Sequence, residues 1–267
     1  MTKDDSNKAS REPRKAPLTP GRLLRSLFAI TFFVTMMYLF VIPYTWAYFT
    51  FGKTSEERRL RYRRWLQGLS RYVIYRVPGV KFRLDNSIGE RFDTPSIVIS
   101  NHQSHLDLMC LMMLTPQLVF LTNDWVWHNP FYGYVIRRAE FVPVSDGIEA
   151  NMAKLRDLYG RGYSIAVFPE GTRSRDGKVG RFHKGAFYLS RELDAPVLPV
   201  YLHGCYDVLP RHDFMLRRGR IDVVVGERVA CAAMRGDLGA VTRERRHRFI
   251  DEFEQQEQKL RQCQSDV

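Results

Sequence analysis

The chain has 267 residues, 45% of them hydrophobic, which is enough for one large domain or two small ones around a sizeable core. Its net charge of +12 and pI near 9.7 favour an anionic partner: nucleic acid, an anionic membrane surface or a phosphorylated substrate. The cysteine spacing excludes a CxxC pair and a cysteine metal site, and predicts reduced thiols facing the cytosol, at Cys110, Cys205, Cys231 and Cys263.

The N-terminal part of the chain changes character at residue 26. Residues 1–25 are polar, rich in Lys, Arg, Ser and Pro, and predicted to be a disordered basic tail. Residues 26–52 carry no charge and exceed the roughly 18 residues that indicate a transmembrane helix. The run is too long for a signal-peptide core, no small-residue cleavage site follows it, and aromatic residues gather at its far end. We therefore predict a membrane segment over 26–52.

Two paths through the membrane fit this segment. Pro43 interrupts the run and favours a bent hairpin in one leaflet with both ends on the cytoplasmic side; a single tilted span is the alternative. Basic residues flank the run on both sides, so the charge distribution does not decide between them. The larger basic block follows the run, which predicts that the part of the chain after the run lies on the cytoplasmic side of the inner membrane. A buried core helix of a soluble protein is disfavoured by the length of the uncharged run.

Residues 53–78 combine arginines with apolar residues at helical spacing and predict a basic amphipathic helix at the membrane interface. Such a helix suits an anionic bilayer surface, and anionic lipids are therefore expected partners. A solvated helix face packed on the following domain is the alternative interpretation.

Strand-like and helix-like segments alternate over residues 79–230. Apolar runs predict strands at 95–100, 117–122, 140–145, 163–168, 195–204 and 220–227. Helical patterns lie between them, at 106–114, 130–139, 149–162 and 185–194. This alternation predicts a single α/β domain whose central sheet is largely parallel and flanked by helices. Residues 231–267 predict a charged C-terminal helix.

The segment SNHQSHLD ends a predicted buried strand with two histidines and an aspartate. If His102 lies in the turn and Asp107 in the first turn of the next helix, the carboxylate can reach the imidazole and fix its tautomer. The other ring nitrogen can then take a proton from a hydroxyl group, as a general base does. A zinc site would need three or four ligands, and no HExxH or Cys/His set supports one. Helix capping by Ser104 or Asp107 fits the spacing equally well.

The segment FPEGTRS follows another predicted strand and favours the catalytic interpretation. Gly171 permits a tight turn with accessible backbone amides. Thr172, Arg173 and Ser174 supply donors suited to a phosphate, and Glu170 can orient the arginine or bond a substrate hydroxyl. Because functional loops of parallel sheets lie at the carboxyl ends of strands, we expect this segment and SNHQSHLD to face one cleft.

The two segments resemble the first and third sequence blocks of the glycerolphosphate acyltransferases, especially the lysophosphatidic acid acyltransferases. The segment APVLPV, residues 195–200, is similar to the fourth block, with Pro199 as its usual proline. The resemblance covers roughly residues 75–230, and the order and spacing of the first and third blocks are very specific. A membrane-associated N-terminus also fits this family.

The resemblance implies acyl transfer without a cofactor or metal ion. His102 would act as general base on an acceptor hydroxyl, with Asp107 orienting it. The hydroxyl would attack an acyl thioester supplied as a co-substrate by acyl-CoA or acyl carrier protein. Glu170, Gly171 and Arg173 would bind the acceptor, a lysophospholipid, with Arg173 on its phosphate.

The second block departs from the family pattern. It often ends in an arginine, and Ser145 stands at that place. Arg137 and Arg138 lie close by and are candidates to supply the charge, although surface residues of a basic protein are an equal interpretation. Lys184 resembles residues that follow the third block and is expected on the same phosphate-binding face. The family assigns no chemistry to His105, which we expect to be structural or peripheral.

Three hypotheses for the function follow. The first is a membrane-bound O-acyltransferase that converts lysophosphatidic acid to phosphatidic acid in phospholipid biosynthesis. The second is the same chemistry on another lysolipid or hydroxylated lipid, such as a lyso-ornithine lipid, which the departure in the second block motivates. The third is a non-enzymatic protein that binds a membrane surface or nucleic acid. Only the net charge of +12 supports it, and the sequence contains no nucleic-acid-binding motif.

Overall fold

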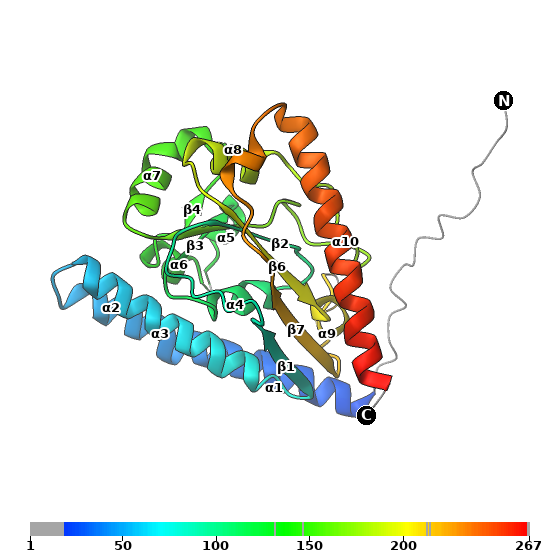
Figure 1. The fold of residues 1–267 in the computed structure, drawn as a ribbon. Coiled ribbons are helices and arrows are strands. Elements are labelled where there is room, and N and C mark those ends of the chain that lie inside the picture. Colours follow the sequence, from blue (N-terminus) through cyan, green and yellow to red (C-terminus); the bar gives the residue numbers. More distant parts are fainter. Residues whose placement is uncertain (1–18, 131, 146, 212, 214, 266–267) are drawn as a thin grey trace.

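The structure is a computed structural model that describes residues 19–130, 132–145, 147–211, 213 and 215–265. Most of the tail predicted for residues 1–25 and the last two residues of the chain lie outside the described residues. A sheet with helices on both faces follows a long apolar helix at the N-terminus (Figure 1). The α/β fold class with a mostly parallel sheet, predicted from the sequence, is confirmed.

The strands that lead into the two motifs lie next to each other in the sheet. The strands are β1 (Val80–Asp85), β2 (Ile97–Ser100), β3 (Leu118–Thr122), β4 (Val142–Pro143), β5 (Ser164–Val167), β6 (Val197–His203) and β7 (Gly219–Val225). Their order is β1-β7-β6-β2-β5-β3-β4, and every neighbouring pair is parallel except β6 and β7. Since β6, β2 and β5 are adjacent and run the same way, the loops after their carboxyl ends meet at one edge.

Helices cover both faces of the sheet, so its central strands are apolar on both sides. In β2, Val98 packs into one hydrophobic core and Ile97 and Ile99 pack into the other, as the alternation of side chains along a strand requires. The first core includes side chains of α3 (Glu56–Tyr75), α4 (Leu106–Met112) and α6 (Gly133–Arg138). The second includes α7 (Met152–Gly160), α8 (Gly185–Glu192) and α10 (Leu238–Ser265). Short helical turns complete the described chain: α5 (Asp124–Trp127), η2 (Glu149–Asn151), α9 (Cys205–Val208) and η3 (Cys231–Met234).

The apolar N-terminal run forms one continuous helix. It consists of α1 (Pro20–Met36), the π-helical turn η1 (Met37–Val41) and α2 (Ile42–Thr50). Pro43 does not reverse the chain, because it lies at the start of α2, just after the π-turn. Within the described residues this is the one helix long and apolar enough to cross a membrane.

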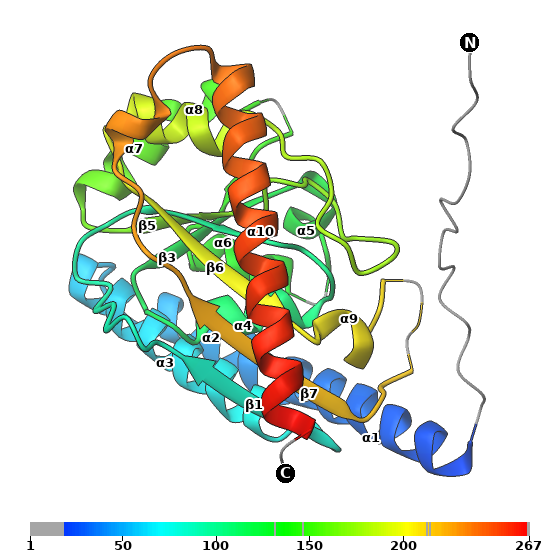
Figure 2. The ribbon, with the colours of Figure 1, turned by 45° about the vertical axis from the view of Figure 1, so that its right-hand side comes forward.

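Both ends of this N-terminal helix are tied to the rest of the protein. Near its start, Arg22 forms a 2.5 Å ion pair with Asp213, and the Ser26 hydroxyl accepts the Leu216 amide at 2.9 Å. Near its end, the hydroxyls of Thr45 and Tyr62 lie 2.8 Å apart, which joins it to α3. The chain reverses between α2 and α3, and α3 runs back beside the first helix (Figure 2).

Candidate active site

His102 and Asp107 are bonded directly. The Nδ1 atom of His102 lies 2.8 Å from Oδ2 of Asp107, which is fully buried in the first turn of α4. The same oxygen accepts the backbone amides of Gln103 at 2.5 Å and Ser104 at 2.8 Å. A carboxylate held this way keeps a proton on Nδ1 and leaves Nε2 with its lone pair. The pair is therefore arranged as an oriented general base.

The loop that carries His102 is bonded to the strand β6 on one side and to the loop after β5 on the other. The Asn101 side chain donates to the Leu202 carbonyl at 2.8 Å and accepts the Leu202 amide at 2.9 Å. On the other side, the His102 carbonyl accepts the Ser174 amide at 2.7 Å. The imidazole stacks on Phe168, with ring centroids 4.1 Å apart. These contacts fix the histidine before any substrate arrives, and they bring the two motifs together as the sequence predicts.

Glu170 braces the two loops from inside. One carboxylate oxygen accepts the His102 amide at 2.8 Å and the other accepts the Gly180 amide at 2.7 Å. The residue is 6% exposed. Burial raises the pKa of Glu170 to about 7, and the two amides offset only part of that effect. The structure thus shows this carboxylate engaged with the chain itself, while the substrate contact expected from the sequence stays a prediction.

A cleft of about 610 Å³ opens beside this brace, with Glu170 in its wall. Thr172 and Arg173 line it, and Nη1 of Arg173 is buried without a hydrogen-bond partner among the described residues. Burial, followed by the charge of Arg211, lowers the pKa of Arg173. An anion in the cleft would satisfy the unused donor and offset the repulsion between the two arginines.

Gly171 and Ser174 shape the loop after β5. Gly171 has φ of +66°, and an added Cβ would meet the ring of His183 at 3.3 Å, so the turn requires glycine. The buried Ser174 hydroxyl donates to the Lys178 carbonyl at 2.8 Å. Ser174 therefore supports the turn, and Thr172 and Arg173 are the better placed donors for a ligand.

Three basic residues named from the sequence do not line the cleft. Arg137 donates to the Trp127 carbonyl at 2.6 Å, and the Arg138 guanidinium lies over the ring of Phe49. Lys184 lies near Gly239, at the start of α10. The structure thus does not bring these side chains to Arg173, and their substrate-binding roles remain predictions.

Ser145 and His105 also have definite places. The Ser145 hydroxyl accepts the Asp124 amide at 3.1 Å, and Ser145 does not line the cleft. His105 immediately precedes α4. Desolvation, followed by the charges of Arg173 and His102, lowers the pKa of His105 to about 4 and keeps it uncharged at neutral pH.

Arg211 is one of the cleft residues that the sequence did not indicate. It follows α9, in the loop after β6, and its Nη1 donates to the Arg173 carbonyl at 2.9 Å. No motif marks this position. Its signal is topological: β6 lies beside β2, so the loops after the two strands share an edge of the sheet.

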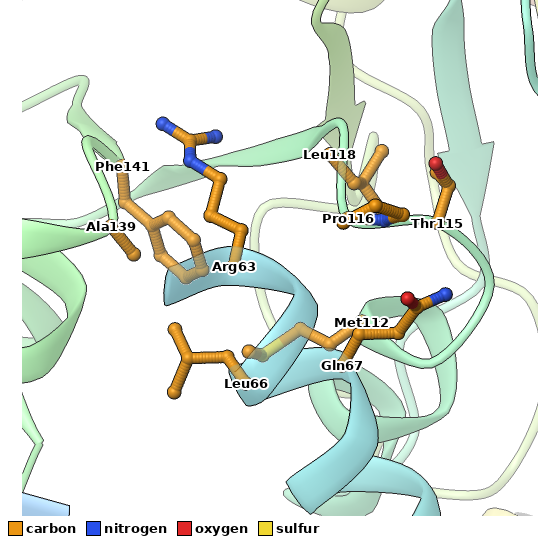
Figure 3. Close-up of a pocket in the computed structure, with 9 residues that line it drawn as sticks. All are labelled: Arg63, Leu66, Gln67, Met112, Thr115, Pro116, Leu118, Ala139 and Phe141. Atoms are coloured by element: carbon orange, nitrogen blue, oxygen red, sulfur yellow. The ribbon is translucent and has the colours of Figure 1, made fainter. Parts of the chain in front are cut away.

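A second cavity lies between α3, α4 and the strand β3 (Figure 3). Its volume is about 10 Å³, room for a single water molecule. It therefore offers no space for a substrate. Within the described part of the chain, no group of three His, Cys, Asp or Glu side chains is arranged to hold a metal ion.

Comparison with known proteins decides the family. The sequence profile described as Acyltransferase matches residues 80–203, which include both motifs. Residues 80–203 of the chain belong to the acyltransferase family. The family resemblance recognised from the sequence is confirmed over these residues.

Relatives of known name support this placement. The chloroplastic 1-acyl-sn-glycerol-3-phosphate acyltransferase BAT2 of Brassica napus is 32% identical over 138 residues, which are 50% of this chain and 40% of that protein. The aligned part thus spans well under half of that relative. The 1-acyl-sn-glycerol-3-phosphate acyltransferase of Pseudomonas aeruginosa is 26% identical over 180 residues, 63% of this chain and 68% of that protein.

The fold is that of a solved bacterial acyltransferase. The crystal structure of the 1-acyl-sn-glycerophosphate (LPA) acyltransferase, PlsC, from Thermotoga maritima superposes with a TM-score of 0.73. The match covers 87% of this chain and 97% of that one, at 22% sequence identity. At that identity the likeness establishes the fold.

Proposed function

We propose that the protein transfers a fatty acyl group from acyl-CoA or acyl carrier protein to the free hydroxyl of lysophosphatidic acid, giving phosphatidic acid. The observation that carries the proposal is the 2.8 Å bond between His102 and Asp107, next to a cleft with an unsatisfied arginine. The names of the relatives from Brassica napus and Pseudomonas aeruginosa agree with this acceptor.

The proposed reaction is a direct transfer from sulfur to oxygen. Nε2 of His102 takes the proton of the acceptor hydroxyl as its oxygen attacks the thioester carbonyl. The tetrahedral intermediate collapses, the C–S bond breaks, and the thiolate leaves and takes the proton back from the imidazolium. The buried Asp107 carboxylate stabilises that imidazolium while it exists. Arg173 and Thr172 bind the acceptor phosphate and so bring its hydroxyl to the histidine.

The N-terminal helix is proposed to lie along one leaflet, with the catalytic domain on the cytoplasmic side of the inner membrane. Its two ends are held by the same body, through Arg22 and through Thr45, which disfavours a perpendicular span. Large apolar side chains, such as Leu24 and Phe40, are exposed along its length and suit an acyl-chain environment.

A different acceptor is the second candidate, because no positive charge stands at Ser145 and neither nearby arginine lines the cleft. In this case the chemistry is unchanged, and a lyso-ornithine lipid or another hydroxylated lipid replaces lysophosphatidic acid.

The test is acyl transfer by the detergent-solubilised full chain. Lysophosphatidic acid would be offered with acyl-CoA or with an acyl thioester of acyl carrier protein, each labelled in its acyl group. The wild type would be assayed beside His102→Ala and, as a control from the same motif, His105→Ala. We expect label in phosphatidic acid, a loss of at least about 10²-fold in His102→Ala and a far smaller change in His105→Ala. Label that enters only other lipids of a membrane extract would support the second candidate. Absence of thioester consumption with any lipid would contradict both.

A further inference from the structure

Two arginines from different loops share one wall of the cleft. Arg173 follows β5 and Arg211 follows β6, and both lie among the residues lining the cleft. A hydrogen bond of 2.9 Å from Arg211 Nη1 to the Arg173 carbonyl holds the second guanidinium beside the first loop. Each side chain is about half-buried, so the two positive charges are close together and poorly solvated.

This arrangement is unfavourable unless an anion is present. Like charges in a desolvated site repel each other, and the unpaired Nη1 of Arg173 adds a buried donor without an acceptor. The two carboxylates in the cleft wall are engaged elsewhere: Glu170 accepts the Gly180 amide, and Asp176 accepts the Lys178 amide at 3.1 Å. Over the described residues, no ion pair joins a carboxylate to either arginine.

The order of the strands brings these arginines to the catalytic base. His102 follows β2, which lies between β5 and β6. The loop of Arg173 is bonded to that of His102 through the amide of Ser174, and the loop of Arg211 is bonded to Arg173. An anion between the two guanidinium groups would therefore be anchored to the same frame as the reacting hydroxyl.

We propose that Arg211 is the second arm of a phosphate clamp with Arg173, and that this clamp makes the enzyme select acceptors with a dianionic phosphate monoester. Two guanidinium forks match the several oxygens and the charge of about −1.5 to −2 of such a group. A phosphodiester headgroup carries one charge and an uncharged headgroup none, so each gains less from the second arm. The assignment of the phosphate to the acceptor rests on the proposed function; the phosphates of acyl-CoA have the same chemistry.

The experiment measures selectivity in Arg211→Gln. We expect kcat/KM for lysophosphatidic acid to fall about 10- to 100-fold, and that for lysophosphatidylglycerol or monoacylglycerol to change less than about threefold. The ratio of kcat/KM between acceptors is decisive, because a purely structural role for the bond to Arg173 would lower kcat/KM for all acceptors alike. Arg211→Lys keeps the charge without the fork and should recover part of the ratio. Arg235→Gln removes the same charge from an exposed position that does not line the cleft, and should leave the ratio between acceptors within about threefold of the wild-type value.

Two further readouts separate the sources of phosphate. A rise in KM for acyl-CoA with an unchanged KM for lysophosphatidic acid would overturn the assignment to the acceptor, and an equal loss on all acceptors would overturn the clamp. Thermal stabilisation by glycerol 3-phosphate tests the clamp without turnover. If the wild type is stabilised and Arg211→Gln is not, the clamp stands even where lysophosphatidic acid is not acylated. If both respond equally, the clamp is contradicted while the proposed function is untouched.

Discussion

The two ends of the strand β5 are both rich in arginine, and the arginines have opposite surroundings. At its amino end, Arg59, Arg63 and Arg161 all bond to the single carboxylate of Glu140, with the Arg63 contact at 2.7 Å. At its carboxyl end, Arg173 and Arg211 line the cleft and have no carboxylate partner among the described residues. Arginines that form ion pairs with a carboxylate of the chain stabilise the fold. Arginines in a cleft without such a carboxylate are available to bind a ligand.

The cluster of Glu140 and its arginine partners joins α3 to the α/β domain. Arg63 projects from α3, is 4% exposed and lies over the ring of Tyr163, which immediately precedes β5. In Figure 3 its guanidinium extends away from the Leu66 side chain. Two of the arginines that suggested a lipid-binding helix are thus turned inward, while Arg61 and Arg64 remain exposed.

The largest effect is expected at the edge of the sheet that carries the cleft, from Asp107→Asn. The amide cannot stabilise the imidazolium or enforce the catalytic tautomer, so kcat should fall about 10²–10⁴-fold at neutral pH. KM for either substrate should change little, because Asp107 is fully buried and is not among the residues that line the cleft. Steady-state kinetics on folded protein, checked by circular dichroism, measures this; a loss below tenfold would exclude a base oriented by Asp107.

At the amino end of β5, a substitution should lower the thermal stability of the protein and leave its turnover largely unchanged. Glu140→Gln leaves the buried Arg63 without its counter-charge, which costs about 3–5 kcal/mol in comparable buried pairs. The apparent Tm should fall by about 6–20 °C, at roughly 2–4 °C per kcal/mol. Because the cluster lies at the opposite end of β5 from the cleft, kcat below the transition should stay within a few-fold. A variant with normal Tm and lost turnover would reverse the roles we assign to the two ends.

The sequence predicts the residues around the cleft better than it predicts the Glu140 cluster at the other end of β5. His102, Asp107 and Arg173 lie in short segments with fixed spacing, so their neighbourhood follows from the strands that precede them. Arg211 and Glu140 carry no such pattern, because their partners are far away along the chain and are brought close only by strand order and helix packing.

The sheet shows the same limit. Alternating segments predict parallel strands, and five of the seven follow that rule. The antiparallel pairing of β6 with β7 does not follow from periodicity, since nothing local states the direction in which a strand returns. Gly204 marks the turn after β6: its φ is +79°, and an added Cβ would lie 1.9 Å from the Arg220 carbonyl oxygen.

A smaller effect is expected from the brace between the motifs, through pH. Below pH about 4.5 both folded and unfolded Glu170 hold a proton; between about 4.5 and 7 only the folded state does, so rising pH favours unfolding. Over this window Glu170 should lower stability by about 3 kcal/mol, at about 1.4 kcal/mol per pH unit. Glu170→Gln cannot ionise, so the slope of its Tm against pH from 5 to 7 should be less negative than that of the wild type. Equal slopes would show that Glu170 is already ionised at pH 5.

The smallest effect is expected from Glu57→Gln, which is the matched control for Glu140→Gln. Glu57 also pairs with an arginine of α3, Arg61, at 2.8 Å, but the two side chains are 80% and 66% exposed. Water and salt screen such a pair, so its loss should cost no more than about 0.5 kcal/mol and shift the apparent Tm by about 2 °C or less. Thermal melts of the two variants side by side therefore compare the same change of charge at a buried and an exposed site. If Glu57→Gln lowered the Tm as much as Glu140→Gln, the total charge of α3 would set the stability. Burial of Arg63 would then not explain the difference between the arginines bonded to Glu140 and those in the cleft.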